Sequence, residues 1–383
     1  MGIIVAKFGG SSAAHAGGFS RILQLVNANS DRRYIVLSAP GKRQPDDKKI
    51  TDLLYAAHRS GYPALKDIKH RYSSIIQELG LSPDPDIFLA DLDASVKESV
   101  DKAISRGEYL SAKLFSIFAD LPMVDAASLI HFDDRGCLDY ERTFESIRRM
   151  ASRTPYAVIP GFYGSRPDGN IQTFTRGGSD ITGALIAAAV HADIYENWTD
   201  VDGLMSVDPK ICPEARCHVA VRYEQMARLA CAGAQVLHPE AIYPVQNIGI
   251  PTILKNTFAP DRPGTYISDH VHCQVPCICV QDNRFAVRLR ALSRQARAIA
   301  QEYGNVFQTK AGEEFLSLSG TGRFMKQPVC EISVFGLSQA QVDASLVPAD
   351  SIPMFLDGNC LRLLVSPERK KETVCALHRC IVF

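Results

Sequence analysis

Hydrophobic and polar residues follow two spacings along this chain, and the switches between them predict the order of its elements. Apolar runs over residues 2–8 and 33–38 predict buried strands, and apolar positions three and four apart over 18–28 predict an amphipathic helix between them. Residues 50–130 follow mostly the helical spacing, which predicts a helical insertion packed on a sheet. Strand composition returns over residues 155–163.

Farther along, a helical run over 181–191 precedes a short strand pattern over 194–198, which ends in the acidic turn Asp200 to Gly203. A glycine-bearing turn, a helix and a strand in this order are the parts of an α/β nucleotide site, where ligands collect beyond the carboxyl ends of strands. Prolines, glycine and polar residues over 256–264 then predict a boundary.

Beyond that boundary the pattern changes to small units that combine antiparallel strands with helices. Such units commonly serve regulation or dimerisation. We expect strands over 276–290, 329–335 and 359–365, a strand pair over 306–319, and helices over 292–303 and 370–379.

Composition excludes several classes of protein. The 383 residues contain 42 Lys and Arg against 42 Asp and Glu, so no overall field favours nucleic acid or an anionic membrane surface. No apolar run approaches the roughly 20 residues of a membrane span, and the first residues lack the pattern of a signal peptide, so we expect a cytoplasmic protein. The 11 cysteines are scattered, which predicts reduced thiols and no zinc site.

Two short motifs carry the candidate chemistry. Arg176-Gly177-Gly178-Ser179-Asp180 combines a guanidinium, two glycines, a hydroxyl and a carboxylate just before the predicted helix, where free backbone N–H groups attract an anion. Lys7-Phe8-Gly9-Gly10-Ser11-Ser12 places a lysine at a strand end beside a turn that lets backbone approach a phosphate. The second motif is neither a Walker A sequence nor GxGxxG, and alone it could be an ordinary strand end.

Three other features have structural readings. Asp200 and Asp202 could form an Asx-type turn before Gly203, and His238 before Pro239 has no nucleophile or metal partner in the sequence. The polar segment 42–49 follows a strand, so it is either a solvated loop or a mobile flap over a ligand.

In their order along the chain, the motifs resemble those of the aspartate kinases, over residues 3 to about 267. The motifs that carry the resemblance are Lys7 to Ser12, Ser38-Ala39, Ile50 to Leu54, Arg106-Gly107-Glu108, Arg176 to Asp180, Thr199 to Gly203, and Val236 to Pro239.

The resemblance implies an amino-acid-kinase fold, an αβα sandwich on a mostly parallel sheet, in residues 1–267. Residues 268–383 would form a shortened ACT-like regulatory or dimerisation region. It also implies transfer of the γ-phosphoryl group of ATP, with Mg2+, to the side-chain carboxylate of L-aspartate. The product, 4-phospho-L-aspartate, would enter the lysine, threonine and methionine branch of amino-acid biosynthesis, and the protein would be a homodimer.

The same resemblance assigns roles residue by residue. Lys7 would steady the transferring phosphoryl group and Asp180 would orient Lys7 or the reacting carboxylate. Glu108 would bind the substrate ammonium and Arg176 its α-carboxylate. The other assigned residues are Gly10, Ser11, Thr51 and Ser179 for the substrate, and Gly9, Thr199, Asp200, Met205, Lys210 and Gln235 for the nucleotide.

The chain departs from the family pattern at two nucleotide positions, because Met205 replaces a frequent aromatic residue and Gln235 a frequent lysine. The region after residue 267 is short for this family and has no clear effector-loop motif. Two alternatives therefore stay open. One is a kinase of another small amino-acid carboxylate in a specialised pathway, and the other is a weakly active regulatory subunit.

Overall fold

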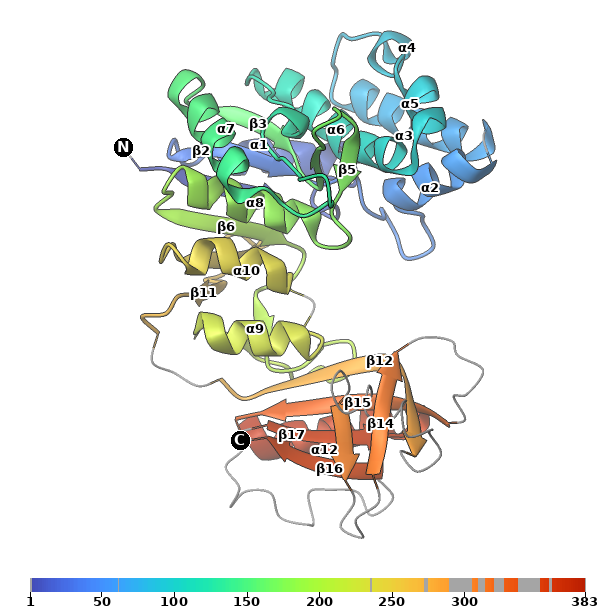
Figure 1. Ribbon diagram of the computed structural model, residues 1–383, viewed down its shortest axis with the longest axis vertical. Helices are drawn as coiled ribbons and strands as arrows, with labels where there is room; N and C mark the ends of the chain where they lie inside the picture. The colour runs from blue at the N-terminus through green and yellow to red at the C-terminus, as the bar shows by residue number, and fades with distance from the viewer. Residues whose placement is uncertain are drawn as a thin grey trace. The chain divides into compact units, whose positions relative to one another are not determined.

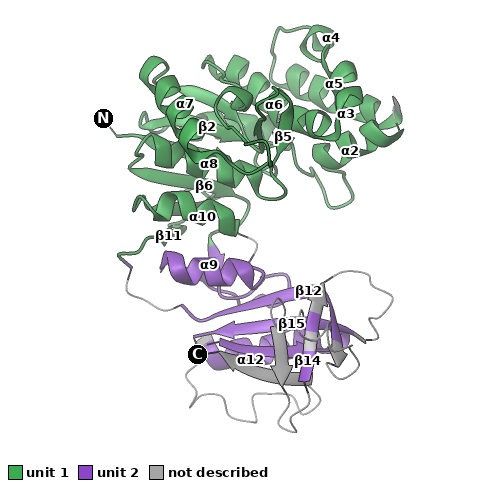
Figure 2. Ribbon diagram, in the orientation of Figure 1, with its two compact units in different colours: residues 1–203, 236–270 green, residues 204–235, 271–383 purple. Residues whose placement is uncertain are grey.

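The computed structural model describes residues 2–60, 62–234, 236–271, 275–288, 305–308, 314–319, 327–336, 352–357 and 360–382. The chain divides into two compact units (Figure 2). The first unit contains Met1–Gly203 and Val236–His270, and the second contains Leu204–Gln235 and Val271–Phe383. Each unit is described by itself below.

A largely parallel sheet forms the centre of the first unit (Figure 1). Its strands lie in the order β3 (Ala157–Pro160), β2 (Arg32–Leu37), β1 (Ile4–Phe8), β6 (Ile194–Thr199), β10 (Thr252–Asn256) and β11 (Thr265–Ile267). Neighbours from β3 to β10 pair in parallel, and β11 is antiparallel to β10. The expected mostly parallel sheet is confirmed.

Helices cover both faces of this sheet. Ala6 and Phe8 of β1 join one buried apolar core with α1 (Ala16–Asn27), α2 (Ile50–Ser60), α3 (Tyr62–Glu78), α4 (Pro85–Phe88), α5 (Leu92–Glu98) and α6 (Val100–Ala119). The helix α8 (Gly178–Ala189) packs against β1 and β2, together with α7 (Tyr140–Arg153) and α10 (Pro239–Gln246). Because side chains alternate along a strand, Lys7 faces away from the Phe8 core.

Most of the elements expected in the first unit are confirmed. The helical insertion is present as α2 to α6, followed by a short 3-10 turn at Ala126–Ser128. The helix expected over 181–191 begins three residues earlier, at Gly178, because the glycine motif forms its first turn. The helices α7 and α10 and the hairpin of β4 (Tyr163–Ser165) and β5 (Ile171–Thr173) were not predicted.

The second unit is built on an antiparallel sheet. Its order is β13 (Asn305–Gln308), β14 (Glu314–Ser319), β12 (Cys277–Arg288), β15 (Gln327–Phe335), β17 (Cys360–Val365) and β16 (Ile352–Asp357). The unit also contains β7 (Leu204–Met205) paired with β8 (Cys217–His218), β9 (Ala220–Val221), α9 (Tyr223–Cys231) and α12 (Lys370–Val382). The predicted strands and the final helix are confirmed, and the helix predicted over 292–303 lies outside the described residues.

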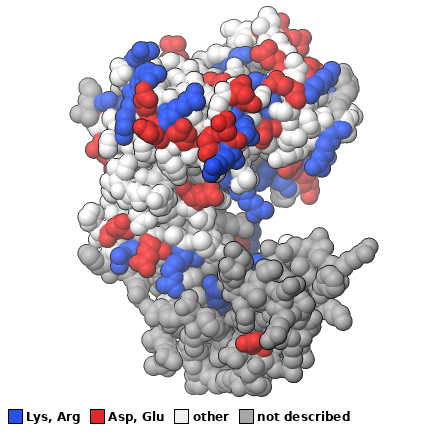
Figure 3. Space-filling view, in the orientation of Figure 1, with Lys and Arg blue, Asp and Glu red and all other residues white. Residues whose placement is uncertain are grey.

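The boundary between the compact units differs from the division predicted at residue 267. Residues 204–235 cluster with the second unit, although the kinase motifs assign them to residues 1–267. The predicted functional domains 1–267 and 268–383 therefore remain a hypothesis. Among the residues that the structure describes, every helix is too short or too polar to cross a bilayer. On the face drawn in Figure 3, basic and acidic side chains are interspersed over the first unit.

Candidate functional site

Lys7 lies at the end of β1 in a nearly buried cluster with two other polar side chains. Its Nζ is 2.6 Å from Oδ1 of Asp180 and 3.4 Å from Oδ1 of Asn197. Asn197 Nδ2 donates to the same Asp180 oxygen at 2.9 Å. Lys7 and Asn197 are register partners on adjacent parallel strands, so the sheet itself sets their spacing. The structure thus brings together the two predicted catalytic residues, Lys7 and Asp180.

Asp180 lies in the first turn of α8, three residues after Gly177, whose backbone conformation and surroundings leave no room for a side chain. Gly177 is the N-cap residue with φ of 60°, and no side chain caps this helix end. A Cβ on Gly177 would lie 2.4 Å from Cβ of His238, which therefore packs directly on the motif. The contact supports the structural role considered for His238. The first turn of α8 thus has no side-chain cap, and free N–H groups at the positive end of a helix dipole favour an anion.

The turn after β1 packs against the turn after β2. Gly9 N donates to Trp198 O at 3.0 Å, and Gly41 N donates to Gly10 O at 2.7 Å. A Cβ on Gly10 would lie 2.7 Å from Ala39 O, so a side chain there would force the two turns apart. Ser12 Oγ lies 2.7 Å from Thr257 Oγ1 and ties this turn to the segment after β10.

Glu108, in the middle of α6, is a buried carboxyl group. Its residue is 5% exposed, and its Oε2 has no hydrogen-bond partner among the described residues. Burial raises the pKa of Glu108 to about 8, against a smaller lowering by hydrogen bonds from backbone N–H groups that include Ala39. The carboxyl therefore lies beside the Ala39 turn and lacks a cation to balance its ionised form.

Two other predicted substrate residues lie around the same turns. A Cβ on Gly107 would lie 2.7 Å from Ala39 Cβ and 3.3 Å from Ile50 Cγ2, so α6 and the start of α2 approach the turn closely. Thr51 follows Ile50 at the start of α2 and is partly exposed. Ser11 is partly exposed, and its N lies 2.9 Å from a Cβ built on Gly41.

The remaining residues of the arginine motif differ in exposure. Ser179 is buried, with its Oγ 2.6 Å from a Cβ built on Gly161. The side chain of Arg176 is exposed just before the N-terminus of α8. A guanidinium at the rim and backbone N–H groups at the helix end suit a carboxylate or phosphate.

The acidic turn after β6 makes side-chain contacts with the segment that follows β10. Thr199 O accepts the N–H of Thr257 at 2.9 Å, and Thr199 Oγ1 lies 3.2 Å from Asp200 Oδ1. The Asp202 carboxylate accepts hydrogen bonds from Asn256 at 2.7 Å and Arg262 at 2.6 Å. The turn is thereby fixed to the segment that follows β10, while Asp200 remains exposed.

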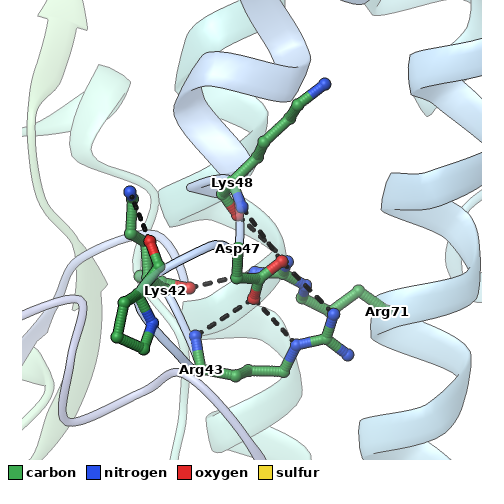
Figure 4. Close-up of polar contacts among 7 residues, drawn as sticks. Lys42, Arg43, Asp47, Lys48 and Arg71 are labelled. Carbon is green, nitrogen blue, oxygen red and sulfur yellow. Dashed lines mark hydrogen bonds and ion pairs between the residues drawn. The ribbon is translucent and has the colours of Figure 1, made fainter.

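Segment 42–49 is held by a charge network from α3 (Figure 4). Arg71 is 3% exposed and donates to Gly41 O at 2.9 Å, to Asp47 Oδ1 at 2.6 Å and to Lys48 O at 3.0 Å. Arg43 donates to the other Asp47 oxygen at 2.9 Å. These contacts hold the loop against α3 and reach Gly41, which packs on Gly10.

Three residues predicted to bind nucleotide do not belong to the first unit. Met205 lies in β7 and Lys210 in the loop that follows, both within the second unit, and Gln235 lies outside the described residues. Their roles stay predictions.

Three residues around the site, Asn197, Thr257 and Arg71, were not predicted from the sequence. Asn197 is a buried polar residue in β6, and its register partner on the adjacent strand β1 is Lys7, which was the available signal. Thr257 and Arg71 carry no local signal, because their partners Ser12 and Asp47 lie 245 and 24 residues away.

Comparison with known proteins agrees with this geometry. A sequence profile of the amino acid kinase family matches residues 2–256. Aspartokinase 3 of Bacillus subtilis (strain 168) is 33% identical over 285 residues, which cover 69% of this chain and 63% of that protein. The chain thus spans slightly under two thirds of the length of this curated relative.

Solved structures match over the whole chain. The aspartate kinase of Clostridium acetobutylicum has a TM-score of 0.80 and 30% identity, with 100% of both chains covered. Aspartokinase III of E. coli, solved in complex with aspartate and ADP, has a TM-score of 0.82 and 22% identity over 100% of both chains, and this likeness shows the fold. The chain therefore belongs to the amino acid kinase family and, within it, to the aspartate kinases.

Proposed function

We propose that this protein transfers the γ-phosphoryl group of MgATP to the side-chain carboxylate of L-aspartate, and releases 4-phospho-L-aspartate and ADP. The aspartate kinase of Clostridium acetobutylicum, at 30% identity over the full length, supports this substrate. The aspartokinase of Bacillus subtilis, at 33% identity, supports it as well.

The observation that carries the proposal is the buried, unbalanced carboxyl of Glu108. Its Oε2 has no hydrogen-bond partner among the described residues, and its pKa of about 8 reflects burial without a cation. The α-ammonium of an amino acid would supply both the missing hydrogen bond and the missing charge. Glu108 adjoins the Ala39 turn, which packs on Gly10 three residues beyond Lys7, so a bound amino acid would lie next to the lysine.

The chemistry requires alignment and charge neutralisation but no general base. An oxygen of the substrate's side-chain carboxylate forms a bond to the γ-phosphorus while the bond from that phosphorus to the β,γ-bridging oxygen breaks, and ADP takes the electron pair. A carboxylate is already ionised at neutral pH, so the protein has to place it in line and neutralise phosphate charge. Lys7, held by Asp180 and Asn197, would stabilise the phosphoryl oxygens.

The residues present also fit a nucleotide. The glycine turn after β1 keeps side chains away from the lysine, because a Cβ on Gly9 would lie 3.6 Å from Lys7 Nζ, and the N-terminus of α8 adds a positive dipole end. Mg2+ usually keeps several waters and binds phosphate oxygens, so it would come with ATP and shield the phosphate charge. Arg176 would bind the α-carboxylate at the rim, and Ser11, Thr51 and Ser179 would line the aspartate pocket.

Other parts of the proposal concern context. A place at the head of the lysine, threonine and methionine branch follows from the proposed product. A cytoplasmic location and a homodimer through residues 268–383 are proposed with it. Light scattering of the purified chain tests the dimer, which predicts twice the chain mass of 42.0 kDa.

The decisive experiment is a hydroxylamine trap. Purified protein is incubated with MgATP and either L-aspartate, L-glutamate, D-aspartate or no acid, and both ADP and hydroxamate are measured. We expect ADP and hydroxamate in equal amounts with L-aspartate alone. Activity with another acid only would replace aspartate as the substrate.

Absence of turnover with every acid would favour the regulatory subunit instead. Binding of L-aspartate, measured by calorimetry on the same preparation, then separates an inactive binder from a protein that does not recognise aspartate. Lys97→Ala changes an exposed residue outside the site, and it serves as the control variant for the site variants described below.

A further inference from the structure

A compact group of metal-binding side chains lies in the second unit, between the loop after β7 and the helix α12. Cys212 is 1% exposed and His378 is fully buried. Cys212 Sγ lies 3.7 Å from His378 Nδ1, and one ligand atom each from Cys212, Glu214 and His378 all lie within 4.8 Å of one another. Glu214 is exposed, so its carboxylate approaches from the solvent side.

Cys375 adds a second sulfur to this group. It lies one turn before His378 on α12, and residues three apart lie on the same face of a helix. Cys375 Sγ donates to the backbone oxygen of Ile211 at 3.6 Å, so it lies beside the residue that precedes Cys212. The loop and the helix therefore contribute two donors each.

The imidazole of His378 is oriented for a ligand. Its Nε2 lies 2.8 Å from Ser206 Oγ, which also accepts the backbone N–H of Arg216 at 2.9 Å. This leaves Nδ1 directed at the Cys212 sulfur. A partner that fixes the far ring nitrogen is typical of metal-binding histidines.

We propose that Cys212, Cys375, His378 and Glu214 bind one Zn2+ ion and thereby join α12 to the loop after β7. Zinc prefers four ligands of sulfur, nitrogen and carboxylate oxygen in tetrahedral geometry. With metal–ligand bonds of roughly 2.0–2.3 Å, two donors in such a site lie about 3.5 Å apart, close to the sulfur–nitrogen separation here. No zinc site is expected from the sequence, because the cysteines are scattered without paired clusters, and the ligands Cys212 and His378 lie 166 residues apart.

The test uses the untagged full chain, reduced and freed of metal by a chelator that is then removed. One equivalent of Zn2+ per chain should bind, and the melting temperature should rise with Zn2+ concentration. Co2+ in its place should give the thiolate-to-cobalt charge-transfer absorption and intense visible bands of a tetrahedral site. Absence of either the stoichiometric binding or the thiolate bands would overturn the proposal.

Variants locate the site. Cys212→Ser, Cys375→Ser and His378→Asn should each weaken Zn2+ binding at least about tenfold, as loss of a ligand or its support does in known sites. Cys380→Ser, an exposed cysteine on the same helix, should bind like the parent chain. Cys375 is only partly buried, so its change to serine should leave the metal-free melting temperature nearly unchanged. Full binding by Cys375→Ser and His378→Asn, or equal loss in Cys380→Ser, would contradict the assignment.

Discussion

The two ends of the candidate site treat buried charge in opposite ways. At the phosphate end, Lys7 is paired with Asp180 at 2.6 Å, and Asn197 bonds to both groups. At the amino-acid end, Glu108 is equally buried, but Oε2 has no hydrogen-bond partner among the described residues. One end is complete without a ligand, and the other is not.

This difference follows from what each end must do. A group that neutralises charge in a transition state works best when its position is fixed beforehand, which the Asp180 and Asn197 contacts achieve for Lys7. A group that recognises a substrate gains most when the substrate supplies its missing partner. The pKa of Glu108 stays raised until a cation binds beside it. Part of the free energy of binding therefore comes from the attraction between the substrate ammonium and the ionised carboxylate.

Removing the lysine should give the largest effect. Lys7→Ala should lower kcat by on the order of 10³-fold, because charge on the transferring group loses its fixed partner. The KM for aspartate should change less than about threefold, since recognition belongs to Glu108. Steady-state kinetics of Lys7→Ala beside Lys97→Ala measure both constants. A kcat within tenfold of the parent enzyme would remove Lys7 from the phosphate end.

The backbone under the phosphate end is the next test. Gly177→Ala should destabilise the fold by about 3 kcal/mol, because a Cβ there combines a left-handed backbone with a collision against His238 at 2.4 Å. Gly80→Ala is the matched control, with φ of 65° against 60° and open space around the built Cβ. Urea unfolding of both variants separates strain from collision. Equal losses in the free energy of unfolding would mean that His238 moves aside without destabilising the fold.

At the amino-acid end, replacing Glu108 with glutamine should separate binding from stability. Glu108→Gln should raise the KM for aspartate by about 10²-fold, since the charge that holds the ammonium is lost. The free energy of unfolding should stay constant or rise, because a neutral amide replaces a buried acid whose pKa is about 8. Kinetics and urea unfolding test the two parts. A clear loss of stability with unchanged KM would make Glu108 structural.

The same carboxyl predicts a pH dependence. The unfolded chain loses the Glu108 proton near pH 4.5, whereas the folded protein keeps it to about pH 8, so Glu108 makes stability fall as pH rises between these values. Aspartate binding favours the ionised form, so its dissociation constant should fall at least about tenfold from pH 6 to pH 8. Calorimetry in buffers of different ionisation enthalpy should detect proton release near pH 7. A flat profile would show that Glu108 is already ionised.

Local patterns in the sequence predicted much of the fold. Strand β1 has an apolar run and α6 has an apolar stripe, so burial alone dictates these two elements. The helix α7 was missed because six of its 14 residues are charged and only Thr143, Ile147 and Met150 are buried. The strand β16 was missed because its apolar run is short and contains Pro353, and Pro348 lies shortly before it.

The candidate site was predictable only where motif and geometry coincide. Lys7 and Asp180 each lie in a glycine motif, and the packing of α8 on β1 brings these motifs together. The pairing of Arg71 with the loop after β2 was not predictable, because nothing in the sequence distinguishes Arg71 from the other basic residues of α3. Long-range polar pairs depend on helix placement, which local periodicity does not determine.

Asp47 offers the smallest and most discriminating test, because one carboxylate meets a buried guanidinium and an exposed one. The side chain of Arg71 is 4% exposed and that of Arg43 is 46% exposed. Arg71→Ala leaves the oxygens of Gly41 and Lys48 without their donor, so we expect a loss of about 2 kcal/mol. Arg43→Ala leaves Asp47 paired with Arg71 and should cost less than about 1 kcal/mol in urea unfolding.

The same two variants should differ in acid. A hydrogen bond from Arg43, aided by the charge of Arg71, holds the pKa of Asp47 well below its usual range. A lowered pKa contributes stability that is present above the unfolded value near 3.8 and is lost as pH falls below it. Arg43→Ala should therefore remove most of this acid sensitivity despite its small cost at pH 7. Arg43→Ala and Arg71→Ala could instead lower the free energy of unfolding equally at pH 7. Burial would then not decide which ion pairs stabilise this protein, and the contrast between Lys7 and Glu108 would need another cause.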